Sequence, residues 1–407
     1  MERTYARTHP WVTFSLPSKP FPSSLWLLLG EAQSKIEHLA GTPLRPETAD
    51  KLHRLYLAKG VRATTAIEGN TLSQEDVEKH LAGELHLPPS KQYMQREVAN
   101  IVEACNDIGT ALLDGSTQSA TVETIKEYNR RVLAGLDLQD GVVPGEIRAH
   151  NVGVLHYRGA PPEDCEYLLD RLCTWLREID GDKPEWITTG WAVLRATVAH
   201  LYLAWIHPFG DGNGRTARLL EFGILVDSGV PTPAAHLLSN HYNETRSQYY
   251  LELDRASKSG GDIAPFLLYA VRGFVDGLRE QINQVRAQQF DIVWQNVVHN
   301  KVSQSKPSPA RDRRRHLIMA ISRNKGFTPV SELMTLNTRV AREYATRTTK
   351  TLSRDLGFLK RLDLVVISRG RVRARQELVR AFVPARKNAA AAAANDPAPS
   401  AGIETRA

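Results

Sequence analysis

The segment that most constrains this chain is Ile206–Arg218, which reads IHPFGDGNGRTAR. Apolar stripes with helical spacing flank it, at Ala192, Ala196, Ala199, Leu203 and Ile206 on one side and at Leu219, Phe222 and Val226 on the other. Such spacing puts apolar side chains on one face of a helix. Pro208 and Gly210 can end the first helix. Gly212 and Gly214 then leave the backbone free to turn sharply, so that N–H groups at the next helix N-terminus converge on an anion.

The side chains of this segment have the chemistry of a phosphate site. His207 can accept a proton from an attacking hydroxyl, and Asp211 is a hard-oxygen ligand for a magnesium ion that bridges phosphates. Asn213 can donate to a phosphate oxygen. Arg215 and Arg218 are three residues apart on the second helix, so both can clamp a polyphosphate. The spacing fits neither a P-loop nor an EF-hand, and no strand precedes the loop as in a dinucleotide-binding fingerprint. A base, a metal ligand and two cationic clamps in one short segment therefore predict phosphoryl or nucleotidyl transfer.

The rest of the chain predicts a mainly α fold. Two places have strand patterns, Val152–His156 and Leu364–Ile367, and no strand–helix alternation indicates a parallel sheet. We expect an N-terminal arm over 1–45 that packs on the body, a catalytic domain over 46–300, a basic domain over 301–387 and a disordered tail over 388–407. The linker is expected near KVSQSKPSPA, at 301–310.

Cysteine usage and hydropathy exclude several classes of protein. The three cysteines, Cys105, Cys165 and Cys173, form no CxxC pair, which disfavours a disulfide framework or a zinc site and favours a reducing cytoplasm. The N-terminus lacks the apolar core of a signal peptide, and Leu25–Leu29 is too short to span a bilayer. No membrane contact is expected.

Charge is unevenly distributed along the chain. The formal net charge is +7, yet residues 301–387 hold 22 Lys and Arg against 6 Asp and Glu, a net charge of +16. A basic C-terminal domain attached to a mildly acidic body predicts an acidic partner for that domain, with DNA as the first candidate.

The segment HPFGDGNGRTAR resembles the signature of Fic proteins, H-x-F-x-[DE]-G-N-G-R-x-x-R, at every specified position. The resemblance implies a helical core with a β-hairpin flap, Mg-ATP as donor, and transfer of AMP to Ser, Thr or Tyr of a target protein. Doc-type phosphotransferases have A-N-K where this chain keeps Gly212, Asn213 and Gly214, so AMP is favoured over phosphate. By the same resemblance, His207 is the general base, Asp211 the metal ligand and Arg218 the γ-phosphate clamp. The implied ATP-binding residues of the segment are Asp211, Gly212, Asn213, Gly214, Arg215, Thr216, Ala217 and Arg218.

An upstream segment, TTAIEGN, ends a predicted helix with Gly69 at the C′ position. Taken alone, Glu68 is an ordinary exposed acid. The pattern resembles the Fic inhibitory helix, [ST]-x-x-x-E-[GN], filled here by Thr64, Glu68 and Gly69 within 64–69. That resemblance implies that Glu68 pairs with Arg218 and keeps it from the γ-phosphate; in some relatives the same Glu supports removal of AMP.

Two further segments resemble parts of the Fic site. Gly145–His156 resembles the flap, whose edge strand, at Val152, Gly153, Val154 and Leu155, holds a target segment by main-chain pairing. Tyr249 and Tyr250 resemble a nucleoside-contacting pair, although tyrosines are more often core residues. Ser257 stands where some relatives carry an Asn that touches the nucleoside.

The basic domain resembles a winged helix-turn-helix. We expect helices at Arg311–Arg323, Thr328–Leu336 and Thr346–Leu364, and a wing at SRGRVRAR. Arg347, Lys350 and Arg354 would face outward from the third helix, with Arg369, Arg371 and Arg373 on the wing. These are phosphate-contact types and do not imply sequence recognition. A protein-docking or dimerisation module is the alternative.

The leading prediction is an autoinhibited protein adenylyltransferase. Two alternatives stay open, an ATP-sensing DNA-binding regulator and an enzyme that uses another nucleotide or a phospholipid-like donor. The expected partners are ATP with Mg²⁺, a protein substrate, the chain itself through self-modification or a homodimer, and DNA through residues 301–387.

Overall fold

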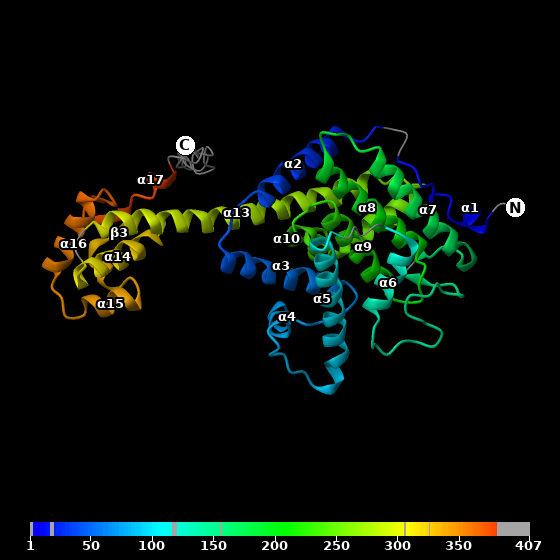
Figure 1. Cartoon of the computed structure of the whole chain (residues 1–407), viewed down its shortest axis with the longest axis horizontal. Helices are drawn as coiled ribbons and strands as arrows, with labels where there is room; N and C mark the ends of the chain where they lie inside the picture. Colours follow the sequence, from blue (N-terminus) through cyan, green and yellow to red (C-terminus); the bar gives the residue numbers. More distant parts are fainter. Residues whose placement is uncertain are drawn as a thin grey trace, which may run out of the picture. The chain divides into compact units, whose positions relative to one another are not determined.

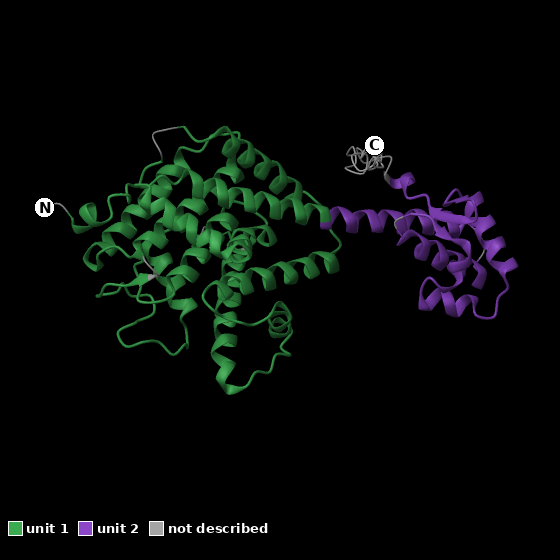
Figure 2. Ribbon diagram, turned by 180° about the vertical axis from the view of Figure 1, so that it is seen from behind, with its two compact units in different colours: residues 1–283 green, residues 284–407 purple. Residues whose placement is uncertain are grey.

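The computed structural model describes residues 3–16, 20–115, 120–154, 157–304, 307–324 and 326–380. The chain divides into two compact units, residues 1–283 and residues 284–407 (Figure 2). The boundary therefore falls inside helix α13, Ala264–Ser303, and not at the polar segment near residue 301. Its physical cause is that Trp294, Val298 and Val302 are buried in the core of the second unit. The predicted disordered tail, 388–407, lies outside the described residues.

Unit 1 is helical apart from one small hairpin, as the sequence predicts (Figure 1). Its elements are, in chain order, α1 (Thr4–Thr8), α2 (Ser23–Ala40), α3 (Pro46–Ile67), α4 (Gln74–Leu81), η1 (Pro89–Lys91), α5 (Gln92–Leu113), α6 (Val122–Val132), β1 (Gly153–Val154), β2 (Tyr157–Arg158), α7 (Pro162–Gly181), α8 (Thr188–Ile206), α9 (Asn213–Asp227), α10 (Thr232–Ala235), α11 (Leu237–Glu244), α12 (Arg246–Lys258) and the first part of α13.

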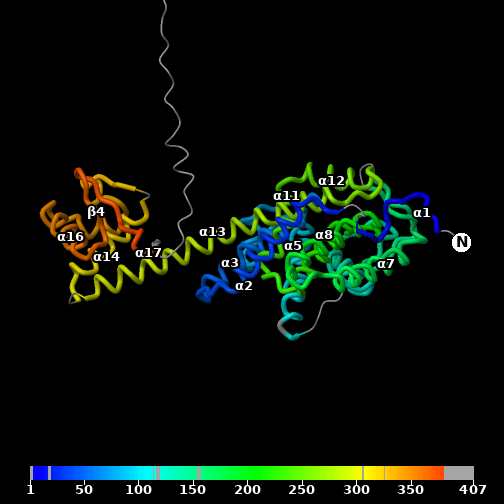
Figure 3. Tube along the Cα trace, turned by 90° about the horizontal axis from the view of Figure 1, so that it is seen from above, coloured from blue at the N-terminus to red at the C-terminus, as the bar shows by residue number. Residues whose placement is uncertain are grey.

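Helix α8 lies inside unit 1, with other helices around it in both views (Figures 1 and 3). Fifteen of its nineteen residues are buried, so it is apolar on all sides rather than amphipathic. It packs against α2, α7 and α9. The predicted stripe from Ala192 to Ile206 is therefore confirmed as part of a helix that is buried on every face.

The N-terminal segment is part of this core. Val12 and Phe14 are buried, and Leu25 and Leu29 of α2 are fully buried in the same hydrophobic cluster. Phe14 packs against Trp175 and Tyr202 of the bundle. Residues 1–45 thus belong to unit 1 as an integral layer.

The predicted hairpin forms between α6 and α7. Strand β1 pairs with β2 in an antiparallel register that sets Gly153 opposite Arg158 and Val154 opposite Tyr157. Two residues of the predicted strand Val152–His156, Leu155 and His156, lie outside the described residues.

Unit 2 combines short helices with a three-stranded antiparallel sheet in the order β3-β5-β4. Its elements after α13 are α14 (Pro309–Ser322), β3 (Thr328–Pro329), η2 (Val330–Thr335), α15 (Thr338–Tyr344), α16 (Thr349–Arg361), β4 (Val365–Ser368), β5 (Arg371–Ala374) and α17 (Glu377–Arg380).

The helix predicted over Thr328–Leu336 is wrong. Thr328 pairs with Val372 in the sheet, and Pro329 pairs with Arg371. The chain continues from there as the 3₁₀ helix η2, and the α-helix begins only at Thr338, after Asn337 caps it by accepting from the Val340 N–H at 2.9 Å. Pro329 is the last residue of β3 and the N-cap of η2, rather than a residue of a first α-helical turn. Both positions suit a residue without an N–H.

Within the described residues, no helix is both long enough and apolar enough to cross a membrane. The three cysteines are free and buried.

The core of unit 2 contains a buried charge cluster centred on Asp355. Its carboxylate accepts from Arg313 Nε at 2.8 Å, from Arg314 Nε at 2.6 Å and from the Tyr344 hydroxyl at 2.8 Å. Burial favours a raised pKa for Asp355, but these donors outweigh burial and lower it. The cluster fixes α16 against α14.

We predict that Asp355→Ala lowers the free energy of unfolding of unit 2 by about 3–5 kcal/mol, because two guanidinium groups lose a buried partner. Calorimetry of the full chain measures this as a downward shift of one transition. As a control, Asp312→Ala removes contacts of 3.8 and 3.9 Å to Arg311 and Arg315 at the surface, and should cost less than about 1 kcal/mol. Equal shifts for both variants would contradict the prediction.

Candidate active site

His207 ends helix α8 in the left-handed conformation, with φ 50° and ψ 58°. Its N–H donates to Leu203 O at 2.9 Å, and Pro208 follows at once and prevents the helix from continuing. A non-glycine residue with positive φ is uncommon and is often found at functional sites. The helix end therefore holds the imidazole in a fixed place at the edge of the loop.

The last carbonyl groups of α8 are capped by the segment that carries the hairpin. The Tyr157 hydroxyl donates to Trp205 O at 2.8 Å, and the Ala160 N–H donates to Ile206 O at 3.1 Å. Carbonyls at a helix C-terminus lack partners within the helix, so these donors stabilise the end of α8. These hydrogen bonds hold the hairpin segment directly against the end of α8, next to His207.

Arg148 donates more hydrogen bonds in this region than the other capping groups, and it is not among the residues predicted from the sequence. Its buried guanidinium donates from Nε to His207 O at 2.8 Å, from Nη1 to His150 O at 2.7 Å and from Nη2 to Ala160 O at 2.5 Å. Three carbonyl acceptors on one cation fix the hairpin segment to the residue that ends α8.

The imidazole of His207 is partly buried and neutral. Its Nδ1 lies 3.4 Å from Ala204 O. Because a carbonyl only accepts, this contact favours the tautomer with the proton on Nδ1 and the lone pair on Nε2. Burial lowers the pKa of His207 to about 4, and the nearby Arg148 cation lowers it too, against the opposing effects of the Ala204 hydrogen bond, Glu68 and Asp211. The side chain is therefore uncharged at neutral pH.

The glycine-rich loop is closed by two asparagines. Asn213 accepts from the Phe209 N–H at 2.9 Å and donates to Phe209 O at 2.8 Å, so its buried amide braces the loop rather than standing free for a phosphate. Asn129 of α6 donates to Asp211 O at 2.9 Å and accepts from the Gly145 N–H at 2.9 Å. Sequence reasoning missed Asn129, because it lies 82 residues before Asp211 in the chain and only the fold brings the two residues together.

Gly212 takes φ 76°, a conformation in which glycine is strongly favoured. Helix α9 begins directly after it at Asn213. The first N–H groups of α9 lack partners within the helix, and they follow His207 closely along the loop, an arrangement that suits anion binding at a helix N-terminus.

Asp211 and Arg215 are coupled in the structure. Arg215 donates to Glu97 Oε1 of α5 at 2.8 Å and lies 3.4 Å from Asp211 Oδ1. The Arg215 side chain is only 6% exposed, whereas that of Asp211 is 53% exposed. Arg215, predicted as a phosphate clamp, is therefore held as part of the loop's support, while the Asp211 carboxylate faces solvent.

Arg218 is paired with Glu68, as the resemblance implies. Its Nη2 donates to Glu68 Oε1 at 2.5 Å and to the main-chain O of Thr64 at 3.0 Å. The Arg218 side chain is 1% exposed and that of Glu68 is 34% exposed. Burial favours a raised pKa for Glu68, but the Arg218 cation outweighs burial and lowers it, so the pair persists at neutral pH and is lost only as the carboxylate takes up a proton in acid.

The Glu68 carboxylate lies against the N-terminal turn of α9. A Cβ added at Gly214 would come within 2.2 Å of Glu68 Oε1, so only glycine leaves room for the carboxylate at this position. Glu68 is the C-cap of α3, and Gly69 follows with φ 103°, which confirms the predicted helix end. A negative group thus already occupies the place where the loop would receive an anion.

The remaining predicted residues are less closely grouped. Tyr249 is 3% exposed, and its hydroxyl lies 2.8 Å from His200 Nε2, so its ring is part of the core. Tyr250 is half-buried and its hydroxyl lies 3.4 Å from Ile67 O, beside the end of α3. Ser257 is buried and donates to Asp254 O at 2.9 Å.

The hairpin presents one edge to solvent. Gly153 of β1 is exposed, and Val152, which precedes β1, is half-buried. The outer side of β2 is covered, because Arg158 O lies 2.9 Å from His9 Nε2 of the N-terminal segment. A strand that pairs with this hairpin would therefore add to β1, where the flap was predicted.

The donor set limits what metal could bind here. Within the described residues, no group of three or more His, Cys, Asp or Glu lies together in a way that could hold a metal ion. The single exposed carboxylate of Asp211 fits a Mg²⁺ ion whose other ligands are phosphate oxygens and water, which is how Mg²⁺ commonly binds with nucleotides.

Comparison with known proteins identifies the same segment. Residues 119–225 match the model of the Fic/DOC family. Protein adenylyltransferase fic-1 of Caenorhabditis briggsae is 30% identical over 258 residues, which cover 61% of this chain and 48% of that protein. Protein adenylyltransferase Fic of Nematostella vectensis is 32% identical over 209 residues, covering 51% of this chain and 45% of that protein. The chain spans about half the length of these curated relatives.

Two solved structures have a similar fold. A Fic family protein from Desulfovibrio desulfuricans G20 aligns with a TM-score of 0.55 at 20% identity, covering 88% of this chain and 98% of that chain, and bears on fold alone. Fic-1 from Caenorhabditis elegans aligns with a TM-score of 0.54 at 28% identity, covering 70% of this chain and 76% of that chain.

We predict that Asn129→Ala loosens the loop without unfolding the chain. The change removes a buried amide that serves both Asp211 O and the Gly145 N–H, and should cost about 1–3 kcal/mol of local stability. Hydrogen exchange should quicken by at least about tenfold at the Gly145 amide, while the exposed control Asn106→Ala leaves that amide unchanged. Unchanged protection at Gly145 in Asn129→Ala would refute the bracing role.

Proposed function

We propose that this chain, which carries a Fic domain at residues 119–225, transfers AMP from ATP to a hydroxyl of a target protein. The observation that carries the proposal is the grouping at the N-terminus of α9. A neutral imidazole, a helix end that attracts anions and the buried Arg218 cation meet there, and the Glu68 carboxylate lies where a phosphate would bind. The names of the relatives support the same activity.

In the proposed reaction the hydroxyl oxygen of the target bonds to the α-phosphorus of ATP. The bond from that phosphorus to the α–β bridging oxygen breaks, and pyrophosphate leaves. His207 Nε2 takes the hydroxyl proton, a role that its free lone pair allows. The N–H groups at the start of α9 stabilise the negative charge of the phosphates. Mg²⁺, held by Asp211 and phosphate oxygens, would neutralise further phosphate charge.

We further propose that Glu68 inhibits this reaction. As long as Glu68 holds Arg218, the guanidinium is not available to the γ-phosphate, and the carboxylate repels the phosphates. Removal of AMP, supported by the same Glu68, is the reverse activity that this arrangement also allows. Transfer of a different nucleotide and nucleotide sensing without transfer are the alternatives, and sensing alone would give no use to a neutral His207.

We predict that Glu68→Gly raises the rate of AMP transfer by at least about tenfold, which corresponds to about 1.4 kcal/mol of barrier. Separate assays with ATP labelled at the α- or γ-phosphorus distinguish the products, because AMP transfer leaves only the α-label on protein, including on the chain itself. Parallel reactions with GTP, CTP and UTP test the donor.

Two controls accompany that assay. Glu84→Gly changes an exposed acid outside the helices and should leave the rate unchanged. Glu68→Gly combined with His207→Ala should transfer nothing, because the base is gone. Transfer by the His207→Ala variant would refute the mechanism, and an unaltered rate in Glu68→Gly would refute the inhibition.

Unit 2 supports a second proposal, that it is a winged helix-turn-helix that contacts DNA phosphates. Helix α16 buries Leu352, Asp355 and Leu356 and carries no acid on its exposed face. Several exposed basic residues form no ion pair with another residue that the structure describes, namely Arg347, Lys350, Arg354, Arg369 and Arg371. By contrast, Arg373 and Arg375 are each paired with acids.

The turn between β4 and β5 supports the same proposal. Arg369 has φ 47° and Gly370 has φ 72°, the pattern of a two-residue hairpin turn that favours Asn, Asp or Gly at both positions. An arginine in the left-handed region carries a conformational cost, so its presence at the tip indicates a use for its charge.

We predict that the full chain binds a labelled DNA duplex at low salt, and that Lys350→Ala with Arg354→Ala weakens binding and reduces the salt slope by about 2. Arg369→Asn should also weaken it, yet fits the turn and keeps the fold. Arg315→Ala on α14 with Arg323→Ala at its C-cap removes the same charge and serves as the control. Equal loss in the control, or no binding at about 50 mM salt, would refute the DNA contact.

Homodimer formation stays a prediction, because the structure describes one chain.

A further inference from the structure

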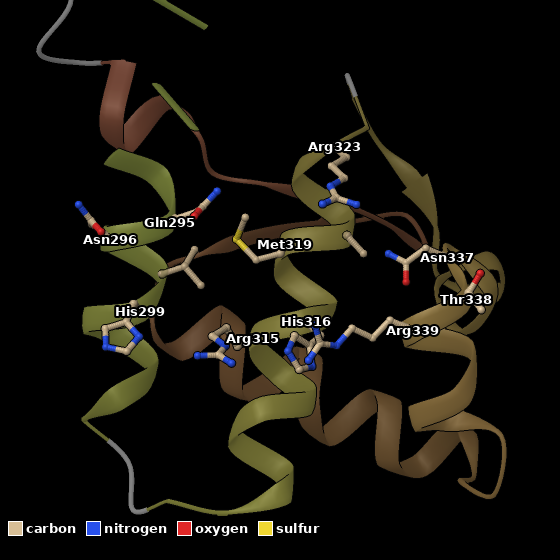
Figure 4. Close-up of a pocket in the computed structure, with 12 residues that line it drawn as sticks. Gln295, Asn296, His299, Arg315, His316, Met319, Arg323, Asn337, Thr338 and Arg339 are labelled. Carbon is tan, nitrogen blue, oxygen red and sulfur yellow. The ribbon is translucent and has the colours of Figure 1, made fainter. Parts of the chain in front are cut away.

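Unit 2 contains a cavity of about 640 Å³ whose walls are formed by α13, α14 and α15 (Figure 4). Five basic side chains line it, from all three helices: His299, Arg315, His316, Arg323 and Arg339. Its volume lies in the range of sites that hold small molecules. The exposed face of α16 is a separate surface, because neither Lys350 nor Arg354 lines this cavity.

The positive charge around the cavity is only partly balanced. Glu343 lies close to two of these side chains, since its carboxylate is 2.6 Å from His316 Nδ1 and 3.9 Å from Arg339 Nε. Arg315 has Asp312 no closer than 3.9 Å. Arg323 forms no ion pair with any residue that the structure describes. A negatively charged occupant would offset this excess of positive charge.

The cavity also offers apolar and amide surface. Val298, Met319 and Ala320 contribute apolar lining, and methionine adapts its shape to different partners. Asn337 and Gln295 add amide groups to the walls. A bare inorganic ion would leave this part of the lining unused, whereas a molecule with an anionic end and an apolar body would cover both parts.

We propose that this cavity binds a small organic anion, with a phosphate or carboxylate group between Arg315 and Arg339 and an apolar body against Met319. Guanidinium groups bind both kinds of anion in a bidentate manner. The site is independent of the proposed transfer chemistry, because every residue that lines it belongs to unit 2.

Four probes test this proposal by titration calorimetry on the full chain. Phenyl phosphate and benzoate carry both an anionic group and an apolar ring, and their relative affinities decide between phosphate and carboxylate. Inorganic phosphate carries the anion alone and phenol the ring alone. We expect at least one of the first two to bind, and to bind at least about tenfold more tightly than either partial probe.

Variants locate the site. Arg315→Ala with Arg339→Ala should weaken binding of the best probe by at least about tenfold, the loss expected for one charge-assisted hydrogen bond. Lys350→Ala with Arg354→Ala removes the same charge from the α16 face and should leave binding unchanged. Met319→Gln keeps the side-chain length and should weaken the ring-bearing probe but not inorganic phosphate.

Several results would overturn the proposal. Binding that survives in the Arg315 and Arg339 variant would place the anion elsewhere. Equal loss in the Lys350 and Arg354 variant would indicate general charge attraction. Inorganic phosphate binding as tightly as the ring-bearing probes, or no binding by any probe, would refute an organic anion. None of these results depends on whether the chain transfers AMP, since transfer is assayed separately.

Discussion

The buried guanidinium of Arg218 is the constraint on which the site depends. A cation with 1% of its side chain exposed needs an anionic partner, because burial without one is costly. In the structure that partner is Glu68, which reaches it from the end of α3 across the N-terminal turn of α9. A triphosphate could serve the same cation only by displacing Glu68. The contact that stabilises the buried guanidinium is therefore the same contact that, in the proposed inhibition, would oppose nucleotide binding.

The rest of unit 1 fixes the geometry of the loop beside this ion pair. Asn129 fixes the loop from α6, and Arg148 ties the hairpin segment to the backbone of His207. Both are buried side chains that bond to main-chain groups, which leaves little freedom to the loop, the base or the hairpin. We infer that release of Glu68 needs no rearrangement of the loop, since none of the loop's own braces involves Glu68.

The sequence predicts that the residues of the loop lie together at a helix junction, because they are close along the chain. His207, Asp211, Gly212 and Gly214 fall within one short segment, and the helical stripes on either side place it at a helix junction. The Glu68–Arg218 pair spans 150 residues, and only the resemblance to a known motif predicts it.

Asn129 and Arg148 could not be recognised in this way. An asparagine in a polar helix and an arginine in a loop are ordinary residues until the fold brings carbonyl groups to them. Tyr249 shows the reverse case, in which a motif-like position has its ring in the core. In unit 2 the segment Thr328–Leu336 was misassigned because its sheet partner, Val372, lies far along the chain.

A double-mutant cycle on the rate of AMP transfer tests the proposed inhibition most directly, with wild type, Glu68→Gly, Arg218→Ala and the double variant. We predict that Glu68→Gly accelerates transfer only when Arg218 is present, because inhibition ends when that guanidinium is released. Equal acceleration in the Arg218→Ala background would contradict it, since Glu68 would then act without the ion pair.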